Sequence, residues 1–487
     1  MTNRRPDSQT HRYLANSQRR ERSVAGSTRR SQQNTQSLAR QSMPREDGLL
    51  RRVLPHPTEH PFFTFKKTKP GFGGLVKAIR AQQGVDTFFL ILVLGLLAFG
   101  LVMMFSAGYV DAQAHEGNAY AYIIPQAKNA LLGLAVMFVI SNIHPSVFRD
   151  WAYAALGTSF VLLVVVLFYH TNLGAGREDI ARFIGFGSFT FQPSEIAKLG
   201  LIMFCAADME ARKGKIMSKI TLGGPFPRWG WARTKAKARD FIRRAWEALS
   251  AIGVYAVVIG GICGLVYKEN HLSGTILLLL LGAVMMWLGG VKWYWFLIPV
   301  AGIALLILAY FAGVGFIQKI FANYMQERVT AWLDKNYDPL GARWQVNQSL
   351  YAIGSGGLFG LGFGRSQQKH LYVSEPHNDF IFSIICEELG YIGAVIILLL
   401  FVFLLRQGFI VAQRQRGDAR RFNGLLCMGI CFQVGLQAAL NIAVVTDTIP
   451  NTGIGLPFFS YGGTSLVILL AEMGMVLSCS RFMRKKR

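Results

Sequence analysis

Long apolar runs recur along the chain and set its class. Several approach the ~20 residues that a helix needs to cross a bilayer, and 52% of all residues are hydrophobic. We therefore predict an all-α polytopic membrane protein with about ten transmembrane helices. The cores of the predicted spans are residues 86–107, 128–145, 153–170, 195–208, 248–267, 272–290, 294–316, 380–405, 424–446 and 463–480.

The placement of basic residues predicts the topology. The formal net charge is +24, and Lys and Arg gather in segments that all lie on one side if the N-terminus is inside. The positive-inside rule then places both termini in the cytoplasm. The same topology makes residues 317–379, between the seventh and eighth spans, one large outer loop. Because orientation and anionic lipid account for the charge, we expect membrane lipids and no nucleic acid as partners.

Composition divides the chain into a tail, a membrane domain and a short end. Residues 1–80 are expected to be a disordered, basic cytoplasmic tail, because the first part of this tail has almost no large apolar side chains. Residues 81–481 form the predicted transmembrane domain, which includes a basic cytoplasmic loop at 209–247. Residues 482–487 form a basic cytoplasmic C-terminal tail. The six cysteines fall within predicted spans without CxxC spacing, so we expect packing residues and no metal site.

The stretch EPHNDFIFSIICEELG opens the eighth predicted span and carries an unexpected set of acids. A carboxylate inside hydrocarbon costs at least a few kcal/mol, so each acid needs a role. Asp379 lies at the outer end, where partial desolvation raises a carboxyl pKa and suits it to act as a general base. The alternative is that Asp379 or Asn378 merely caps the helix.

Glu387 and Glu388 lie eight and nine residues further along, which is ~12–14 Å deeper along a helix. Neither can easily share one proton-transfer site with Asp379, so we expect hydrogen bonds or ion pairs inside the bundle. Lys198, a rare Lys within a span, is one candidate partner. Glu195 and Lys198 are spaced i, i+3, so they can instead pair with each other.

Three segments together resemble a known family. They are GSGGLFGLGFGRSQQKHLYVSEPHNDFIFSIICEELGYIG from residue 354, ARFIGFGSFTFQPSEIAKLG (181–200) and PNTGIGLPFFSYGGTSL (450–466). They resemble the SEDS family of cell-wall polymerases, and within it the cell-division FtsW and sporulation SpoVE branch more than the elongation RodA branch. The chain departs from the family at Ala181 and Phe183, where Arg and Trp are common. It also departs at KENHLSG (268–274), where a Pro-Asp-Leu-Gly type turn is usual.

The resemblance implies a peptidoglycan glycosyltransferase that polymerises lipid II at the outer face of the bacterial cytoplasmic membrane, for septal wall synthesis in cell division. It implies Asp379 as the catalytic carboxylate. The diphosphate leaving group calls for cations on the outer side, where Arg182 and Lys369 rank first because both lie in matched motifs. The further candidates for substrate binding are His377, Glu375 and Arg343. A divalent cation bridging Asp379 and the diphosphate is an open alternative, although no ligand cluster in the sequence requires one.

The family also implies partners: a class B penicillin-binding transpeptidase and other division proteins. Two rival functions stay open on the sequence alone. A lipid II flippase has similar spans and a polar cavity, and a non-catalytic division scaffold needs no outer carboxylate.

Overall fold

The structure is a computed structural model that describes residues 84–169, 182–186, 189–212, 252–312, 324–335, 337–341, 343–415 and 420–482. The predictions for the tail 1–80, for most of the loop 209–247 and for the last five residues lie outside this described part. The chain divides into two units, Met1–Lys69 and Pro70–Arg487. All described residues belong to the second unit.

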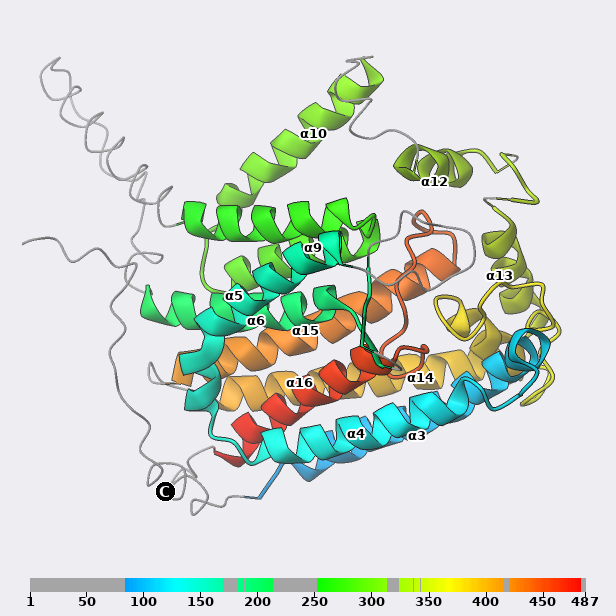
Figure 1. The fold of residues 1–487 in the computed structure, drawn as a ribbon, viewed down its shortest axis with the longest axis horizontal. Coiled ribbons are helices and arrows are strands. Elements are labelled where there is room, and N and C mark those ends of the chain that lie inside the picture. The colour runs from blue at the N-terminus through cyan, green and yellow to red at the C-terminus, as the bar shows by residue number, and fades with distance from the viewer. Residues whose placement is uncertain are drawn as a thin grey trace, which may run out of the picture. The chain divides into compact units, whose positions relative to one another are not determined.

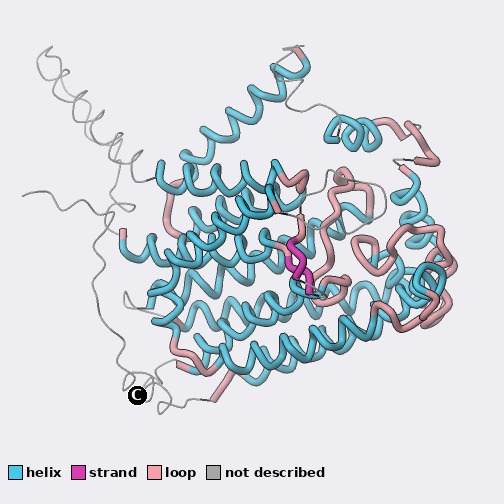
Figure 2. Tube along the Cα trace, in the orientation of Figure 1, coloured by secondary structure: helices cyan, strands magenta, loops and turns pink. Residues whose placement is uncertain are grey.

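The described part consists of helices joined by loops, with one short hairpin (Figure 1). The helices in chain order are α3 (Thr87–Glu116), α4 (Ile123–Ser141), α5 (Pro145–Phe168), α6 (Pro193–Ala211), Ile252–Lys268, α9 (Leu272–Leu288), η1 (Trp293–Phe296), α10 (Leu297–Phe311), α12 (Tyr324–Leu333), α13 (Trp344–Ser355), α14 (Ile381–Arg414), α15 (Arg421–Val445) and α16 (Gly463–Arg481). Strands β1 (Ile184–Phe186) and β2 (Phe189–Phe191) pair antiparallel, and Figure 2 shows them surrounded by helices and loops.

Within the described residues each predicted span overlaps a helix, so the predicted fold class is confirmed. Six described helices are long and apolar enough to span a membrane: α3, α4, α5, α14, α15 and α16. The other four predicted spans are α6, which carries four charged side chains, and three helices shorter than 18 residues. The count of ten spans is therefore not established by length and composition.

Local signals fix where the helices begin and end. The Asp86 carboxylate accepts a hydrogen bond from the Phe89 amide at the start of α3, and Gly117 ends that helix with φ 67°. Pro145 opens α5, where its missing N–H costs nothing.

The start of α3 and the end of α14 lie together at one end of the bundle. Gln407 Nε2 donates to both oxygens of Asp86 at 2.9 and 2.8 Å, and Arg414 lies 3.5 Å from the same carboxylate. One buried apolar cluster runs through the helices, with α4 packed on α16, α5 on α6, and α14 on α15 and α3. The opposite end of the bundle gathers the hairpin, the loop before α14 and the loop between α15 and α16.

Helix α14 is broken near its start. Gly390 has φ 67° and ψ −171°, which no helix adopts. The break leaves a short helical piece, 381–389, and a long one, 391–414. The short piece begins two residues after Asp379. Contacts that hold this piece in place therefore also restrict the position of the Asp379 backbone.

Candidate active site

A cavity of about 1280 Å³ opens among the loops at the Asp379 end of the bundle. Its walls come from the helices α3, α4, α6, α9, α15 and α16, from the residues on either side of the hairpin, and from the loops before α14 and α16. The sequence-predicted residues that line it are Asp379, Arg182, His377, Glu375, Glu195 and Lys198. Two stretches far apart in the sequence, 182–198 and 375–379, thus bring these side chains to one space.

Asp379 is held through its backbone. Three consecutive carbonyls, those of residues 377–379, each accept a hydrogen bond from a different donor. The Tyr461 amide donates to the first at 2.9 Å, Ser460 Oγ to the second at 2.7 Å, and Asn441 Nδ2 to the third at 2.7 Å. Asn441 also donates to the Ile454 carbonyl at 2.6 Å, and its side chain is fully buried. The segment is therefore fixed from both α15 and the α15–α16 loop.

The carboxylate of Asp379 has no such partner. In the part of the chain that the structure describes, no donor hydrogen-bonds to it, and it does not cap α14, whose N-cap is Phe380 without a side-chain cap. The capping alternative therefore does not describe this residue. Gly453, with φ 71°, lies so close that a Cβ at this position would be 3.1 Å from Asp379 Oδ2. A glycine here leaves room beside the carboxylate.

The surroundings of Asp379 favour the protonated form of its carboxyl group more than water does for a free aspartate. Burial raises the pKa of Asp379 from 3.8 to about 6 and the Glu375 carboxylate adds to the rise, while Arg182 and Arg328 oppose it. A pKa near 6 leaves the group mostly ionised at neutral pH but more basic than an ordinary aspartate. That combination suits a general base.

His377 lines the cavity as a neutral aromatic ring. It stacks on Tyr122 at 4.3 Å between ring centres and meets Tyr461 edge-on at 5.6 Å. Burial lowers the pKa of His377, against the carboxylates of Asp111 and Glu375 that raise it. Glu375 is exposed with φ 52° and accepts a hydrogen bond from Asn378 Nδ2 at 2.8 Å.

Of the three cations predicted to bind the substrate, Arg182, Lys369 and Arg343, only Arg182 lines the cavity. It follows the segment outside the described residues and donates to the Asn270 carbonyl. Arg343 is buried in an ion pair with Asp447 at 2.5 Å and donates to the Ala331 carbonyl. We therefore do not place Arg343 at the substrate, because its charge is matched by Asp447 in the loop between α15 and α16.

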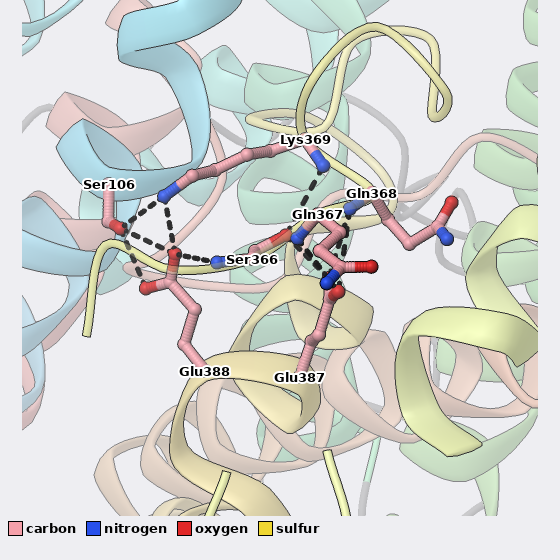
Figure 3. A network of polar contacts seen from close by, with 7 residues as sticks. All are labelled: Ser106, Ser366, Gln367, Gln368, Lys369, Glu387 and Glu388. Carbon is pink, nitrogen blue, oxygen red and sulfur yellow. Dashed lines mark hydrogen bonds and ion pairs between the residues drawn. The ribbon is translucent and has the colours of Figure 1, made fainter. Parts of the chain in front are cut away.

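Lys369 is also away from the cavity. Its ammonium is fully buried, 2.6 Å from Glu388 Oε1 and 4.8 Å from the centre of the Tyr109 ring. Figure 3 shows this pair with Ser106, whose hydroxyl donates to Glu388 at 2.7 and 2.9 Å. The Lys that sequence reasoning assigned to the diphosphate thus neutralises an acid in the bundle.

Glu387 lies beside this pair and binds residues of the loop before α14. Its carboxylate accepts hydrogen bonds from Ser366 Oγ at 2.5 Å and from the Gln367 amide at 2.9 Å (Figure 3). Both glutamates are fully buried, and neither lines the cavity. The network ties the loop 366–369 to the short piece of α14.

Lys198 pairs with Glu195 at 2.8 Å, and not with Glu387 or Glu388. Lys198 Nζ also donates to Gln437 Oε1 at 3.1 Å, and Gln437 Nε2 donates to the Gly455 carbonyl at 3.0 Å. The polar wall of the cavity is therefore linked to the same α15–α16 loop that holds Asp379.

Neither Asn441 nor Gly453 was singled out from the sequence. Gly453 lies within the third matched segment, and Asn441 is a polar residue in an apolar run, which was the available signal. Among the described residues, no three His, Cys, Asp or Glu side chains lie close enough to hold a metal ion.

The family model described as "Cell cycle protein" (FtsW, RodA and SpoVE) matches residues 86–485. A relative named "Probable peptidoglycan glycosyltransferase FtsW" from Geobacter sp. (strain M18) is 33% identical over 83% of this chain and 99% of its own length. "Stage V sporulation protein E" of Bacillus subtilis (strain 168) is 34% identical over 82% of this chain and 98% of its own.

Solved structures share the fold. One chain is described under "Structural coordination of polymerization and crosslinking by a peptidoglycan synthase complex". It matches with a TM-score of 0.61 and 25% identity over 82% of this chain and 98% of its own. The rod shape determining protein RodA of Thermus thermophilus matches with a TM-score of 0.55 and 24% identity over 83% of this chain and 99% of its own. The resemblance found in the sequence motifs is thus confirmed: the chain is a multi-pass membrane protein that belongs to the FtsW/RodA/SpoVE (SEDS) family.

Proposed function

We infer that this protein is a peptidoglycan glycosyltransferase that polymerises lipid II. The observation that carries the inference is Asp379. Its carboxylate lines a large cavity, accepts no hydrogen bond from the described residues and has a raised pKa of about 6. Membership of a family whose relatives are named as peptidoglycan glycosyltransferases supports the assignment.

The proposed reaction joins two lipid-linked sugars. Asp379 takes the proton from the 4-hydroxyl of the incoming GlcNAc as that oxygen bonds to the anomeric carbon of the growing strand. The bond from that carbon to the diphosphate breaks, and the lipid diphosphate leaves with the electron pair. The guanidinium of Arg182, on the cavity wall, is placed to stabilise the negative charge that develops there.

Polymerisation of purified lipid II by the purified full chain tests this function. Asp379→Asn keeps the size of the side chain but removes the base, so we expect glycan strands from the wild type and none above background from the variant. Asp334→Asn is the matched control, because it makes the same change on an exposed part of the outer loop. Near-normal polymer from a folded Asp379→Asn protein would refute Asp379 as the base.

The same assay separates the enzyme from its rivals. A flippase moves lipid II without lengthening it, and a scaffold leaves it unchanged. Absence of polymer from the wild type, alone and with its partner, would favour one of these.

We further propose a single-span transpeptidase of the class B penicillin-binding type as partner, with the pair acting at the division septum. Glycan made here needs crosslinking, and the solved relative belongs to a complex in which polymerisation and crosslinking are coordinated. Co-purification from detergent, followed by the lipid II assay, tests the partnership. Failure to co-purify would reject it. Imaging of a fluorescent fusion tests the septal position.

A further inference from the structure

The glycine-rich segment before Asp379 fills the break in α14. The Leu361 amide donates to the Glu387 carbonyl at 2.9 Å, and the Gly362 amide donates to the Glu388 carbonyl at 3.0 Å. In return, the Tyr391 amide donates to the Gly357 carbonyl at 2.9 Å, and the Ile392 amide to the Leu358 carbonyl at 3.2 Å. The loop thus satisfies the backbone groups that the broken helix leaves free.

The glycines permit this close approach. A Cβ on Gly360 would lie 2.1 Å from the Glu388 carbonyl oxygen, and a Cβ on Gly390 would lie 2.3 Å from the Gly360 nitrogen. Both residues also have positive φ. The series of glycines, which resembles a nucleotide-binding loop only superficially, is explained by this contact between two backbones.

The depth of the contact follows from α3. Ser106, which binds Glu388, lies 20 residues beyond Asp86, which is bound by Arg414 at the other end of the bundle. Twenty helical residues span about 30 Å, the thickness of the hydrocarbon core. If Asp86 marks the inner boundary, the Glu388 level marks the outer one. A loop that bonds to residues 387–392 therefore lies at the outer boundary of the hydrocarbon, and not above it in water.

The tip of this loop is apolar and uncovered. Phe359 is 80% exposed, Leu358 63% and Phe363 53%. Beside them, on the backbone to which the loop is bonded, Tyr391 is 66% and Ile392 42% exposed. The apolar surface is continuous with the exposed face of α14 further in, at Ile396 and Leu399, where lipid is the surrounding medium.

We propose that the loop tip, Leu358, Phe359 and Phe363, inserts into the outer leaflet and that lipid acyl chains are its occupant. The segment is then a re-entrant anchor within the predicted outer loop 317–379. Backbone groups at membrane depth need bonds within the protein, and the four hydrogen bonds to α14 provide them for the carbonyls of 357 and 358 and the amides of 361 and 362. Tyr391 beside the tip is of a residue type enriched at membrane interfaces, and Leu and Phe are typical of segments that bury an apolar face there.

The anchor holds the short piece of α14 through these hydrogen bonds. This piece is bonded to the loop on one side and leads back to Asp379 at its start. Anchoring the loop in lipid holds Asp379 at the level where the head group of a lipid-linked substrate meets water. This consequence rests on the proposed function, whereas the lipid contact itself does not.

The test measures depth directly. Phe359→Cys and Leu358→Cys are each labelled with the fluorophore NBD in the full-length chain and placed in phosphatidylethanolamine–phosphatidylglycerol nanodiscs. Leu340→Cys is the matched control: it is an exposed apolar residue of the same outer loop, 82% exposed between α12 and α13, with no bond to α14. Labelled wild type gives the background, since the six native cysteines are buried.

We expect a nitroxide on acyl carbon 5 of added phosphatidylcholine to quench the labels at 358 and 359 at least twofold more than the label at 340. Aqueous iodide should quench in the reverse order. Equal quenching at all three positions overturns the proposal. Shielding of 358 and 359 from both quenchers also overturns it, because a protein surface then covers the tip.

A second arm tests the consequence. Phe359→Asp should lower glycan synthesis in nanodiscs severalfold, whereas Leu340→Asp should leave it unchanged. If both variants synthesise glycan at the wild-type rate while the label at 359 is quenched from the lipid, the lipid contact stands. Its role in positioning Asp379 is then refuted.

Discussion

The buried pair Lys369–Glu388 provides the sharpest test of what holds the site together. Both side chains are fully buried, and their charged atoms lie 2.6 Å apart. Lys369→Met keeps the apolar stem and removes the charge. Glu388→Met does the same for the acid. Removing one partner of a buried pair leaves the other charge without its counter-ion, which typically costs about 3–5 kcal/mol.

The expected loss of stability differs between the two variants, because different contacts remain for the charge that is left. In Lys369→Met, the Glu388 carboxylate keeps the Ser106 hydroxyl at 2.7 Å and the Ser366 amide at 3.4 Å, so we expect the lower figure, about 3 kcal/mol. In Glu388→Met, the Lys369 ammonium keeps only the Ser106 hydroxyl at 3.4 Å and the Tyr109 ring, so we expect about 4–5 kcal/mol. The double variant replaces the pair by apolar side chains of similar volume, and we expect a loss of about 1 kcal/mol or less.

The assay is unfolding in mixed micelles of increasing SDS content, followed by tryptophan fluorescence, with the four proteins forming a double-mutant cycle. Lipid II polymerisation by the same samples reports on the site. Both single variants should lose most activity, and the double variant should regain a large part of it. If the double variant is as unstable as the sum of the two singles, the pair is not coupled and the reasoning fails.

Two further predictions concern Asp379 and its supports, and a third concerns the ion pair between Arg343 and Asp447. The rate of glycan synthesis at saturating lipid II should rise with pH through about 6, since the ionised form is the base. A midpoint near 4 would contradict the raised pKa. Asn441→Ala removes two hydrogen bonds to carbonyls, so kcat should fall by about 10-fold to 100-fold (about 1–3 kcal/mol) while the pH midpoint stays. A shifted midpoint would mean that Asn441 acts on the carboxylate itself. Asp447→Gly relieves a positive φ of 55° but breaks the ion pair with Arg343. The fold should therefore persist while limited proteolysis cuts the outer loop faster, whereas unchanged proteolysis would show that the pair does not hold the loop.

Much of the fold could be predicted because apolar runs report burial in lipid directly. The eighth span was predicted at 380–405 and the helix runs over Ile381–Arg414. Its outer boundary was correct, but its inner end was missed. The extra residues, 406–414, mix polar and apolar side chains. Gln407 and Arg414 among them bind Asp86, a contact between positions more than 300 residues apart that no local pattern shows.

The candidate site could be predicted only in part. Asp379 and Arg182 both line the cavity, and both lie in segments that match motifs of the family. Lys369 and Arg343 do not, because a sequence shows that a cation is on the outer side but not which acid it meets. Their acids, Glu388 and Asp447, are 19 and 104 residues away.

The way Asp379 is fixed explains why its supports were hard to foresee. A catalytic base must be placed accurately, yet a donor bound to its carboxylate would lower its pKa and occupy the atom that takes the proton. The chain meets both needs by holding three backbone carbonyls, at residues 377–379, and leaving the carboxylate of Asp379 without a donor among the described residues. Every residue has a backbone carbonyl, so the sequence does not show which carbonyls are bound. For the same reason no pattern marks the donors as parts of the site: Asn441, Ser460 and the Tyr461 amide. Gly453 completes the arrangement, because any side chain there would fill the space beside the oxygen that must reach the substrate.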